Sequence, residues 1–246
     1  MRVGGAALIV LIALAGMAAL LAWRLGVAGA AARAPIHVVA VGHNWWWEFV
    51  YPESGVKTAN ELHLPANAQV QMELRSVDVL HTLSVPEVAL QADAIPGRSS
   101  YVMFHTPRTG ELGGECSEIC GTAHNMMRVK VIVESPADFE TWMNQQQAPA
   151  AAPQTEQQWT GYELVITACA RCHSLDPIEP RTDLLGPNLA HLMSRSVFAG
   201  ASFTLNETNL RRWMRDSQEM KAGNDMDNHV LRQDHEAVVE YLLTLK

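Results

Sequence analysis

The sequence predicts a multi-domain chain with one N-terminal transmembrane helix, then an all-β domain, then an all-α domain. Three observations support this prediction. Residues 3–23 are uncharged and mostly apolar, residues 36–135 contain short runs that alternate apolar with polar residues, and the tail repeats apolar residues at helical spacing. The expected parts are residues 1–33 (anchor), 34–144 (β domain), 145–157 (flexible linker) and 158–246 (C-terminal domain).

The first part is expected to be a membrane anchor. The apolar run over residues 3–23 is long enough to cross a bilayer as a helix, and Trp23 and Arg24 suit its interfacial end. A cleaved signal peptide is the alternative, with Arg2 as the basic start and residues 28–30 as a cleavage-like Ala-Gly-Ala. The length of the run favours the anchor over a signal peptide.

The β domain is predicted from five short runs that are bounded by glycine, proline and asparagine. Several of them alternate apolar with polar residues, which is typical of sheets with one face in the core. A closing helix is expected over residues 136–142. The expected strands are residues 36–41, 62–64, 70–74, 101–104 and 129–133.

The C-terminal domain is predicted to be helical. Apolar stripes at helical spacing run over residues 161–169 and 238–245, and residues 186–192 and 210–214 also read as helical. The linker over 145–157 is polar and rich in proline and alanine, so we expect a flexible tether.

Residues 116–127, which we call the ligand loop, concentrate soft metal ligands. They include Cys116, Cys120, His124 and Met127, and His81 upstream supplies a second imidazole. A blue-copper site needs one cysteine, two histidines and a weak methionine, so the second cysteine suggests a site for two copper ions. A zinc site and a disulfide between the two cysteines remain alternatives.

A second motif, Cys169-Ala-Arg-Cys172-His173, is the signature of covalent c-type haem attachment. In this motif both thiols add to the haem and the histidine becomes an axial iron ligand. A thioredoxin-like redox pair or half of a zinc site is the alternative. Such a haem usually takes a methionine as its second axial ligand. The candidates are Met193, Met214, Met220 and Met226. Of these, Met214 fits a helical apolar pattern and is more simply interpreted as a core residue.

These motifs resemble subunit II of the haem–copper oxidases over roughly residues 36–145. The resemblance rests on residues 42–49, 77–86, 92–98 and 116–127. It implies a cupredoxin-like Greek-key barrel that carries a dinuclear copper site, CuA. By this resemblance the terminal ligands are His81 and His124, the bridging thiolates are Cys116 and Cys120, and the axial ligands are Met127, rather than Met126, and the Glu118 carbonyl. It also implies that Trp45 is an exposed ring through which electrons enter, and that the Glu118 side chain reaches a Mg ion shared with subunit I.

The tail resembles the class I cytochrome c domain that is fused to caa-type oxidase subunits II. That family has a Gly-Asn-x-Met-Pro loop, and residues 223–226 match it, so Met226 is the expected axial ligand. Asp227 stands where the family has proline. The resemblance also implies that the carbonyl of Pro187 orients His173, and that the first and last helices cross at Gly161 and Tyr241.

The resemblance implies an electron-transfer subunit of a proton-translocating terminal oxidase in a bacterial cytoplasmic membrane. Both domains are expected on the periplasmic side. Electrons are expected to pass from a cytochrome c or a quinol-oxidising complex through haem c and CuA to subunit I, where O2 is reduced. The expected partners are subunit I and other membrane subunits. A CuA-containing nitric oxide reductase, a free periplasmic shuttle and a non-redox copper carrier are the alternatives. A formal net charge of −8 argues against nucleic-acid binding.

Overall fold

The computed structural model describes residues 4–24, 34–181, 184–226 and 235–246. It forms two compact units, Met1–Ala34 and Pro35–Lys246. A helix forms in the expected place, α1 (Gly4–Arg24). No helix among the described residues has the length and hydropathy that a membrane crossing requires, so the anchor is unconfirmed. The cleavage-like residues 28–30 lie outside the described residues.

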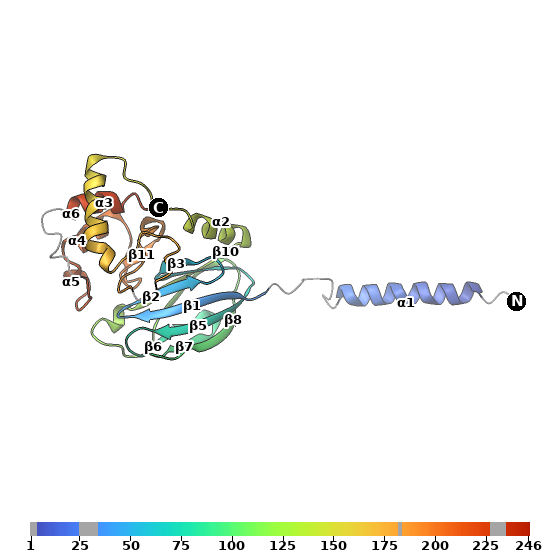
Figure 1. Ribbon diagram of the computed structural model, residues 1–246. Coiled ribbons are helices and arrows are strands. Elements are labelled where there is room, and N and C mark those ends of the chain that lie inside the picture. The colour runs from blue at the N-terminus through green and yellow to red at the C-terminus, as the bar shows by residue number, and fades with distance from the viewer. Residues whose placement is uncertain (1–3, 25–33, 182–183, 227–234) are drawn as a thin grey trace. The chain divides into compact units, whose positions relative to one another are not determined.

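The second unit begins with a sandwich of two five-stranded sheets (Figure 1). The first sheet has the order β3-β2-β1-β5-β8, in which β1 and β5 are parallel and the other neighbours antiparallel. Its strands are β1 (Ile36–His43), β2 (Trp46–Tyr51), β3 (Val56–Ala59), β5 (Gln69–Ser76) and β8 (Ser100–His105).

The second sheet has the order β4-β10-β9-β6-β7, in which only the β4–β10 pair is parallel. Its strands are β4 (Glu61–Pro65), β6 (His81–Val85), β7 (Leu90–Ala94), β9 (Gly110–Cys116) and β10 (Arg128–Glu134). The five expected strands are all present. Five further strands of the sandwich were not expected: β2, β3, β6, β7 and β9, the last of which contains three glycines. One of them is required, because a Cβ at Gly114 would lie 2.5 Å from the carbonyl oxygen of Ser84.

The sandwich is closed by helix α2 (Pro136–Gln146), which is longer than expected. Ser135 begins it by accepting a hydrogen bond from the amide of Asp138, and Pro136 fits the first turn because it has no amide to satisfy. Short 3₁₀ turns lie at Pro86–Val88, His124–Met126, Cys169–Arg171 and Leu192–Ser194.

The C-terminal domain is helical and has a core of its own, separate from that of the sandwich. Its first and last helices cross at Gly161, where a Cβ would lie 2.0 Å from the carbonyl oxygen of Ala237 and 3.0 Å from Tyr241, so the expected glycine contact is present. The elements are α3 (Glu156–Ala168), β11 (Val197–Phe198), β12 (Phe203–Thr204), α4 (Glu207–Arg215), α5 (Ser217–Met220) and α6 (His235–Leu242).

The helix expected over residues 186–192 does not form, and that prediction was wrong. Two of its amides bond to the haem-motif segment instead of to their own turn. The amide of Gly186 donates to the carbonyl of Cys172 at 2.9 Å, and the amide of Leu189 donates to the carbonyl of Ser174 at 2.8 Å. These long-range bonds satisfy the backbone, so this segment packs as irregular chain against the motif.

The segment that we expected to be a flexible tether packs along the C-terminal domain. Pro153 is buried, the carbonyl of Ala151 accepts a hydrogen bond from the Tyr241 hydroxyl at 3.3 Å, and the carbonyl of Ala148 lies 2.9 Å from Nε2 of His191. A polar, proline-rich composition therefore did not prevent packing here, because the backbone carbonyls find partners.

The two domains contact each other through the β11–β12 hairpin. The carboxylate of Glu61 in β4 accepts hydrogen bonds from the Ser196 amide and hydroxyl and from the Val197 amide, at 2.6 to 3.0 Å. The amide of Arg128 donates to the carbonyl of Gly200 at 2.8 Å. The hairpin is thereby fixed beside the end of the sandwich that carries the ligand loop.

Candidate metal and haem sites

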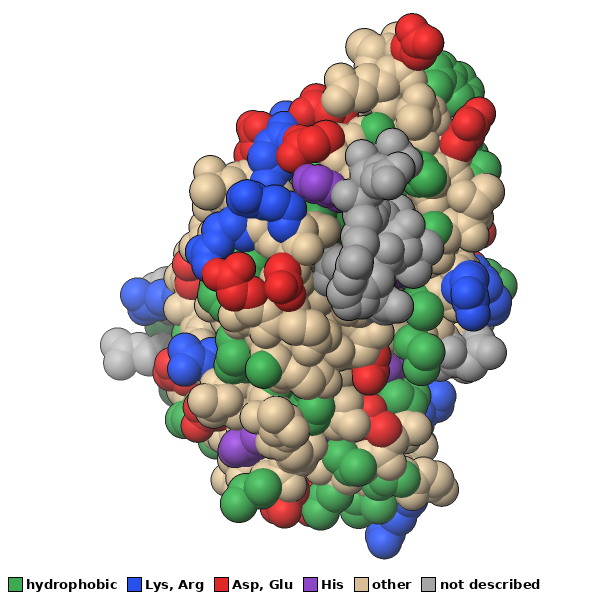
Figure 2. Space-filling view, turned by 90° about the vertical axis from the view of Figure 1, so that its left-hand side faces the viewer, with side chains coloured by type: hydrophobic (Ala, Val, Ile, Leu, Met, Phe, Trp, Pro, Cys, Tyr) green, Lys and Arg blue, Asp and Glu red, His purple; other side chains and the backbone are tan. Residues whose placement is uncertain are grey.

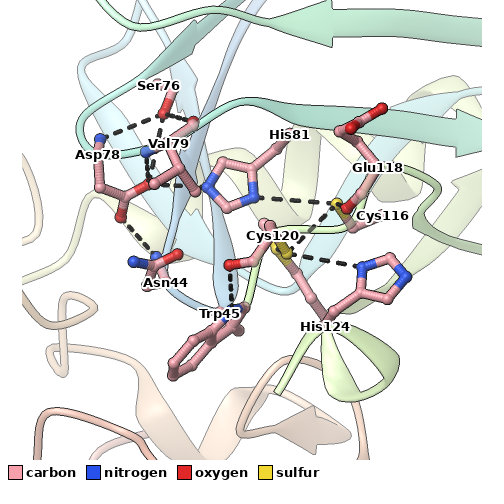
Figure 3. Close-up of polar contacts among 11 residues, drawn as sticks. Asn44, Trp45, Ser76, Asp78, Val79, His81, Cys116, Glu118, Cys120 and His124 are labelled. Atoms are coloured by element: carbon pink, nitrogen blue, oxygen red, sulfur yellow. Dashed lines mark hydrogen bonds and ion pairs between the residues drawn. The ribbon is translucent and has the colours of Figure 1, made fainter. Parts of the chain in front are cut away.

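The structure brings the soft ligands of the ligand loop and β6 together (Figure 3). The sulfurs of Cys116 and Cys120 are 3.7 Å apart. A disulfide bond is about 2.05 Å long, and both cysteines are free. Three of the ligand atoms, from His81, Cys116 and Cys120, lie within 4.8 Å of one another, and all three residues are buried.

His81 is fixed by a hydrogen-bonded carboxylate. Its Nδ1 lies 3.8 Å from the Cys116 sulfur, and its Nε2 is 2.8 Å from Asp78. Asp78 in turn accepts hydrogen bonds from the amides of Asn44 and Val79 (Figure 3). Burial lowers the pKa of His81, but its bonds to Asp78 and Cys116 outweigh burial and raise it. Ligand histidines in metal sites are commonly oriented by such a carboxylate.

The remaining donors also face the sulfurs. Nδ1 of His124 lies 3.6 Å from the Cys120 sulfur, and the thioether sulfur of Met127 lies 3.9 Å from it. The carbonyl oxygen of Glu118 is 3.2 Å from the Cys116 sulfur, whereas the Glu118 side chain points away (Figure 3). Met127 is fully buried beside the cysteines. A set with a thioether favours copper over zinc, which takes thiolate, imidazole and carboxylate.

The two thiols have unequal acidities. Burial raises the pKa of Cys116, but hydrogen bonds with His81 and with the backbone of Thr82 and Glu118 outweigh burial and lower the pKa to about 7. Burial and the charge of Cys116 raise the pKa of Cys120 to about 12. One thiolate therefore forms near neutral pH, and a bound cation has to displace the proton of the second.

Trp45 lies beside the ligand loop and is only 9% exposed, so the expectation of an exposed ring was wrong. Its Nε1 donates a hydrogen bond to the carbonyl of Cys120 at 2.8 Å. A Cβ at Gly121, whose φ is +116°, would lie 3.0 Å from the ring. The reason for the burial is tertiary, because the C-terminal domain covers the turn between β1 and β2 that carries Trp45.

The haem motif opens into a cavity of about 410 Å³ that is lined mostly by apolar side chains. Cys169, Cys172, His173, Pro187 and Met226 all line it. Nδ1 of His173 lies 2.7 Å from the carbonyl of Pro187, as expected, which leaves Nε2 for an iron ion. Burial lowers the pKa of His173, which favours the neutral, ligating form.

Two of the four candidate methionines line this cavity, Met214 and Met226. The Met226 sulfur accepts a hydrogen bond from Nε1 of Trp213 at 2.9 Å, and its amide donates to Oδ1 of Asn224. Met214 is buried in the helical core, as its spacing predicted. Met193 and Met220 are absent from the described lining of the cavity. Asp227 lies outside the described residues.

Sequence reasoning missed two basic residues that line the cavity, Arg195 and Lys221. Burial lowers the pKa of Arg195 to about 10 and that of Lys221 to about 7. Within the described part of the chain, Nε of Arg195 has no hydrogen-bond partner. A mostly apolar cavity with a buried, partly unpaired cation suits a flat apolar ligand that carries carboxylates, such as haem. No local pattern marks either residue, because both lie in ordinary polar segments.

The β domain supplies part of the cavity wall. Asn44, Trp45, Trp46 and Asn60 line it together with residues of the C-terminal domain. The cavity therefore depends on the packing of both domains, and the sequence motif accounts for only one side of it.

Comparison with known proteins identifies both domains. Residues 54–135 match the family described as cytochrome C oxidase subunit II, periplasmic domain, and residues 159–246 match the cytochrome c family. Cytochrome c oxidase subunit 2 of Alkalihalophilus pseudofirmus is 28% identical over 214 residues, which is 86% of this chain and 61% of the relative. The protein of the same name from Bacillus sp. (strain PS3) is 30% identical over 216 residues, 83% of this chain and 60% of the relative.

The chain thus spans about three fifths of the length of these curated relatives. Among solved structures, the periplasmic domain of subunit II of cytochrome oxidase from Bradyrhizobium japonicum is 28% identical. The match has a TM-score of 0.44 and covers 46% of this chain and 94% of that one.

The fold and the two ligand sets define an electron-transfer protein that joins a cupredoxin-like domain to a cytochrome c domain. The chain joins a cytochrome c oxidase subunit II periplasmic domain to a cytochrome c domain, and the curated relatives named above are cytochrome c oxidase subunits 2. The two matched domains imply copper in the first domain and haem in the second. The two expected domain types are confirmed.

Proposed function

We propose that this chain is the electron-transfer subunit II of a proton-translocating membrane terminal oxidase that reduces O2 to water. When bound, a haem c and a dinuclear copper supply the electron carriers, through which the chain passes electrons from an external donor to subunit I. The single observation that supports this best is that Trp45 contacts the ligand loop and also lines the haem cavity. One residue thus contacts both candidate sites, and both sites lie within one compact unit.

The copper ligands in this proposal are the two cysteines and the residues whose donor atoms lie beside their sulfurs. They are His81, Cys116, Cys120, His124, Met127 and the carbonyl of Glu118. The haem is held covalently by Cys169 and Cys172, and its iron is held by His173 and Met226, with Pro187 orienting the histidine.

The donor approaches the C-terminal domain in this proposal. Leu185 lines the haem cavity and is still 65% exposed, so an apolar contact is available at the cavity rim. Basic and acidic side chains lie side by side on the face that Figure 2 shows. In the C-terminal domain, Arg211 bonds to Glu207, Glu236 and Glu240. Such a mixed surface suits a transient partner such as a cytochrome c or a quinol-oxidising complex.

The membrane part of the proposal rests on the apolar run at the N-terminus. The chain is anchored by this run in the bacterial cytoplasmic membrane, with both domains on the periplasmic side, and assembles with subunit I and other membrane subunits. The side chain of Glu118, which points away from the sulfurs, is free to reach a Mg ion shared with subunit I.

Purification of the full chain with its membrane partners tests the proposal. We expect the α-band of a c-type haem, the purple absorption of CuA and two coppers per chain, together with O2 consumption by the complex. A chain that matures with zinc between the cysteines, or without covalent haem, contradicts the proposal. Consumption of nitric oxide but not of O2 assigns the complex to the nitric oxide reductases instead.

A further inference from the structure

Trp45 is enclosed by contacts from both domains. The ligand loop contacts it through the Cys120 carbonyl and through Gly121. The C-terminal domain contacts it through Gly223, where a Cβ would lie 3.6 Å from the indole ring, and through the side chain of Lys221. The Trp45 ring, which the resemblance implies is the point of electron entry to the copper site, is therefore covered by the chain's own second domain.

The side chain of Lys221 joins three segments at this point. Its Nζ donates hydrogen bonds to the carbonyl oxygens of Trp45 at 2.5 Å, Met126 at 3.1 Å and Ala199 at 3.0 Å. These carbonyls belong to the turn between β1 and β2, to the end of the ligand loop and to the β11–β12 hairpin. An ammonium has three N–H donors and no acceptor, so three carbonyls use all of its donors. Lys221 is 3% exposed.

A glycine makes this close approach possible. Gly200, in the same hairpin, has a φ of +75°, and a Cβ there would lie 2.3 Å from the Met126 oxygen, 2.6 Å from Nζ of Lys221 and 2.6 Å from the Trp45 oxygen. Any side chain at this position has to displace the hairpin from the ligand loop. The Ser202 hydroxyl also donates to the Met126 carbonyl at 2.9 Å, so the hairpin and Lys221 bind the same carbonyl.

We propose that Lys221 is a positioning residue that fixes the C-terminal domain over Trp45, which closes this ring to outside donors and makes the C-terminal domain the route by which electrons reach the copper site. The inference rests on the proposed function for the direction of electron flow. The docking itself does not depend on either cofactor, because every contact that supports it is between residues of the chain.

Oxidative footprinting of the full-length chain, read at Trp45 by mass spectrometry, tests the docking. We expect Trp45 to be protected in the wild type and to be labelled several-fold faster in Lys221→Met, which removes the ammonium but keeps an unbranched side chain. Arg215→Met is the matched control, because it removes an exposed cation from the same domain and should leave labelling unchanged. Equal labelling of Trp45 in the wild type and in Lys221→Met overturns the proposal.

A second variant keeps the test decisive if Lys221→Met does not fold. Gly200→Ala is expected to raise labelling of Trp45 by pushing the hairpin away. Its control is Gly97→Ala, since Gly97 has a similar φ of +70° but nothing within 4 Å of the added Cβ. Unchanged labelling in Gly200→Ala likewise overturns the proposal.

Stopped-flow reduction by a soluble c-type cytochrome then tests the route in the loaded protein. In the wild type, the copper absorption should change only after the haem band, at a rate that does not depend on donor concentration. In Lys221→Met, a copper phase that accelerates with donor concentration should appear. The same donor-dependent copper phase in the wild type overturns the proposal. Absence of either cofactor contradicts the proposed function instead, while the footprint still reports the docking.

Discussion

The ligand loop and the haem cavity are two cofactor sites of different construction. In the ligand loop, most donor atoms come from one short segment, and backbone bonds within it and to its neighbours fix their positions, such as Cys116 to Met127 at 2.8 Å and Ser117 to Thr82 at 2.9 Å. In the haem cavity, the attachment motif is local, but Met226 and the walls come from distant segments of both domains. A site built on one loop is set by local chain geometry, whereas a cavity exists only after the domains have packed.

The largest expected effect separates the two sites. Replacing the proposed bridging thiolate in Cys120→Ser should abolish the copper pair, because a hydroxyl is a much harder and less acidic ligand than a thiol. The haem should be unaffected, since its attachment lies in the other domain. Metal analysis and the purple absorption report the copper, and the α-band reports the haem. Cys172→Ser is the matched control, which should weaken haem attachment and leave copper bound. A normal copper pair in Cys120→Ser contradicts the assignment.

The next effect concerns Met226, the proposed second axial ligand of the haem iron. Met226→Ala should lower the haem reduction potential by on the order of 0.1 V, because a methionine ligand raises it and axial ligands set potentials over a range of about 0.8 V. The copper reduction potential should not change. Met127→Leu should instead change the copper potential and leave the haem potential unchanged. Potentiometric titration measures both. Met220→Ala, a buried methionine outside the described lining, should leave the haem potential unchanged. A shift in Met220→Ala alone reassigns the ligand to Met220.

A smaller effect tests how firmly the copper site is held by its surroundings. Asp78→Asn removes the charge that orients His81, and loss of such a partner typically weakens metal binding about 10–100-fold. Copper competition with a chelator measures this loss. Asp225→Asn, an exposed carboxylate at the haem cavity, should not change copper affinity. Equal affinity in Asp78→Asn and the wild type shows that Asp78 does not hold His81 in its ligating position.

The smallest effect concerns the contact between the domains. Nδ1 of His63 lies 3.1 Å from Glu134 and its Nε2 lies 3.6 Å from Glu61, the residue that holds the hairpin. Burial lowers the pKa of His63, but the two carboxylates outweigh burial and raise it. The folded-state pKa of His63 lies above its unfolded value. The ion pairs of protonated His63 with Glu61 and Glu134 therefore stabilise the fold fully below about pH 6.5. This contribution is lost as the pH rises through the folded-state pKa.

Thermal unfolding as a function of pH measures this contribution. We expect the melting temperature of the wild type to fall as the pH rises through the folded-state pKa of His63. The melting temperature of His63→Gln should change less over the same pH range. His105→Gln replaces an exposed histidine of the same domain and should follow the wild type. Parallel curves for His63→Gln and the wild type show that this histidine does not stabilise the contact.

Much of the fold followed from local pattern. The five expected strands are present because alternating β-branched and apolar residues indicate a half-buried strand wherever they occur, as in β10. Strand β9 was missed because its glycines carry no such signal and serve close packing against Ser84. The helix expected over 186–192 was wrong because Gly186 and Leu189 bond to the haem-motif segment, which a window of neighbouring residues does not contain.

The candidate sites divide in the same way. The spacing of cysteine, histidine and methionine predicted the ligand loop and the haem motif, because each is a short segment whose donors are close in sequence. The sequence did not indicate Arg195 and Lys221, because a lone cation in a polar segment is usually exposed. Only the packing of the two domains buries them at the cavity.

The amino-acid sequence by itself determined which chemistry this chain can carry, since soft ligands and paired thiols have the same affinities wherever the chain places them. Tertiary structure alone decided how the two sites are related. It covered Trp45, completed the haem cavity with residues of the β domain and aligned three carbonyls around Lys221. The physical reason is that burial and hydrogen bonding between distant segments depend on which surfaces pack against each other. A local sequence pattern does not predict which surfaces pack together.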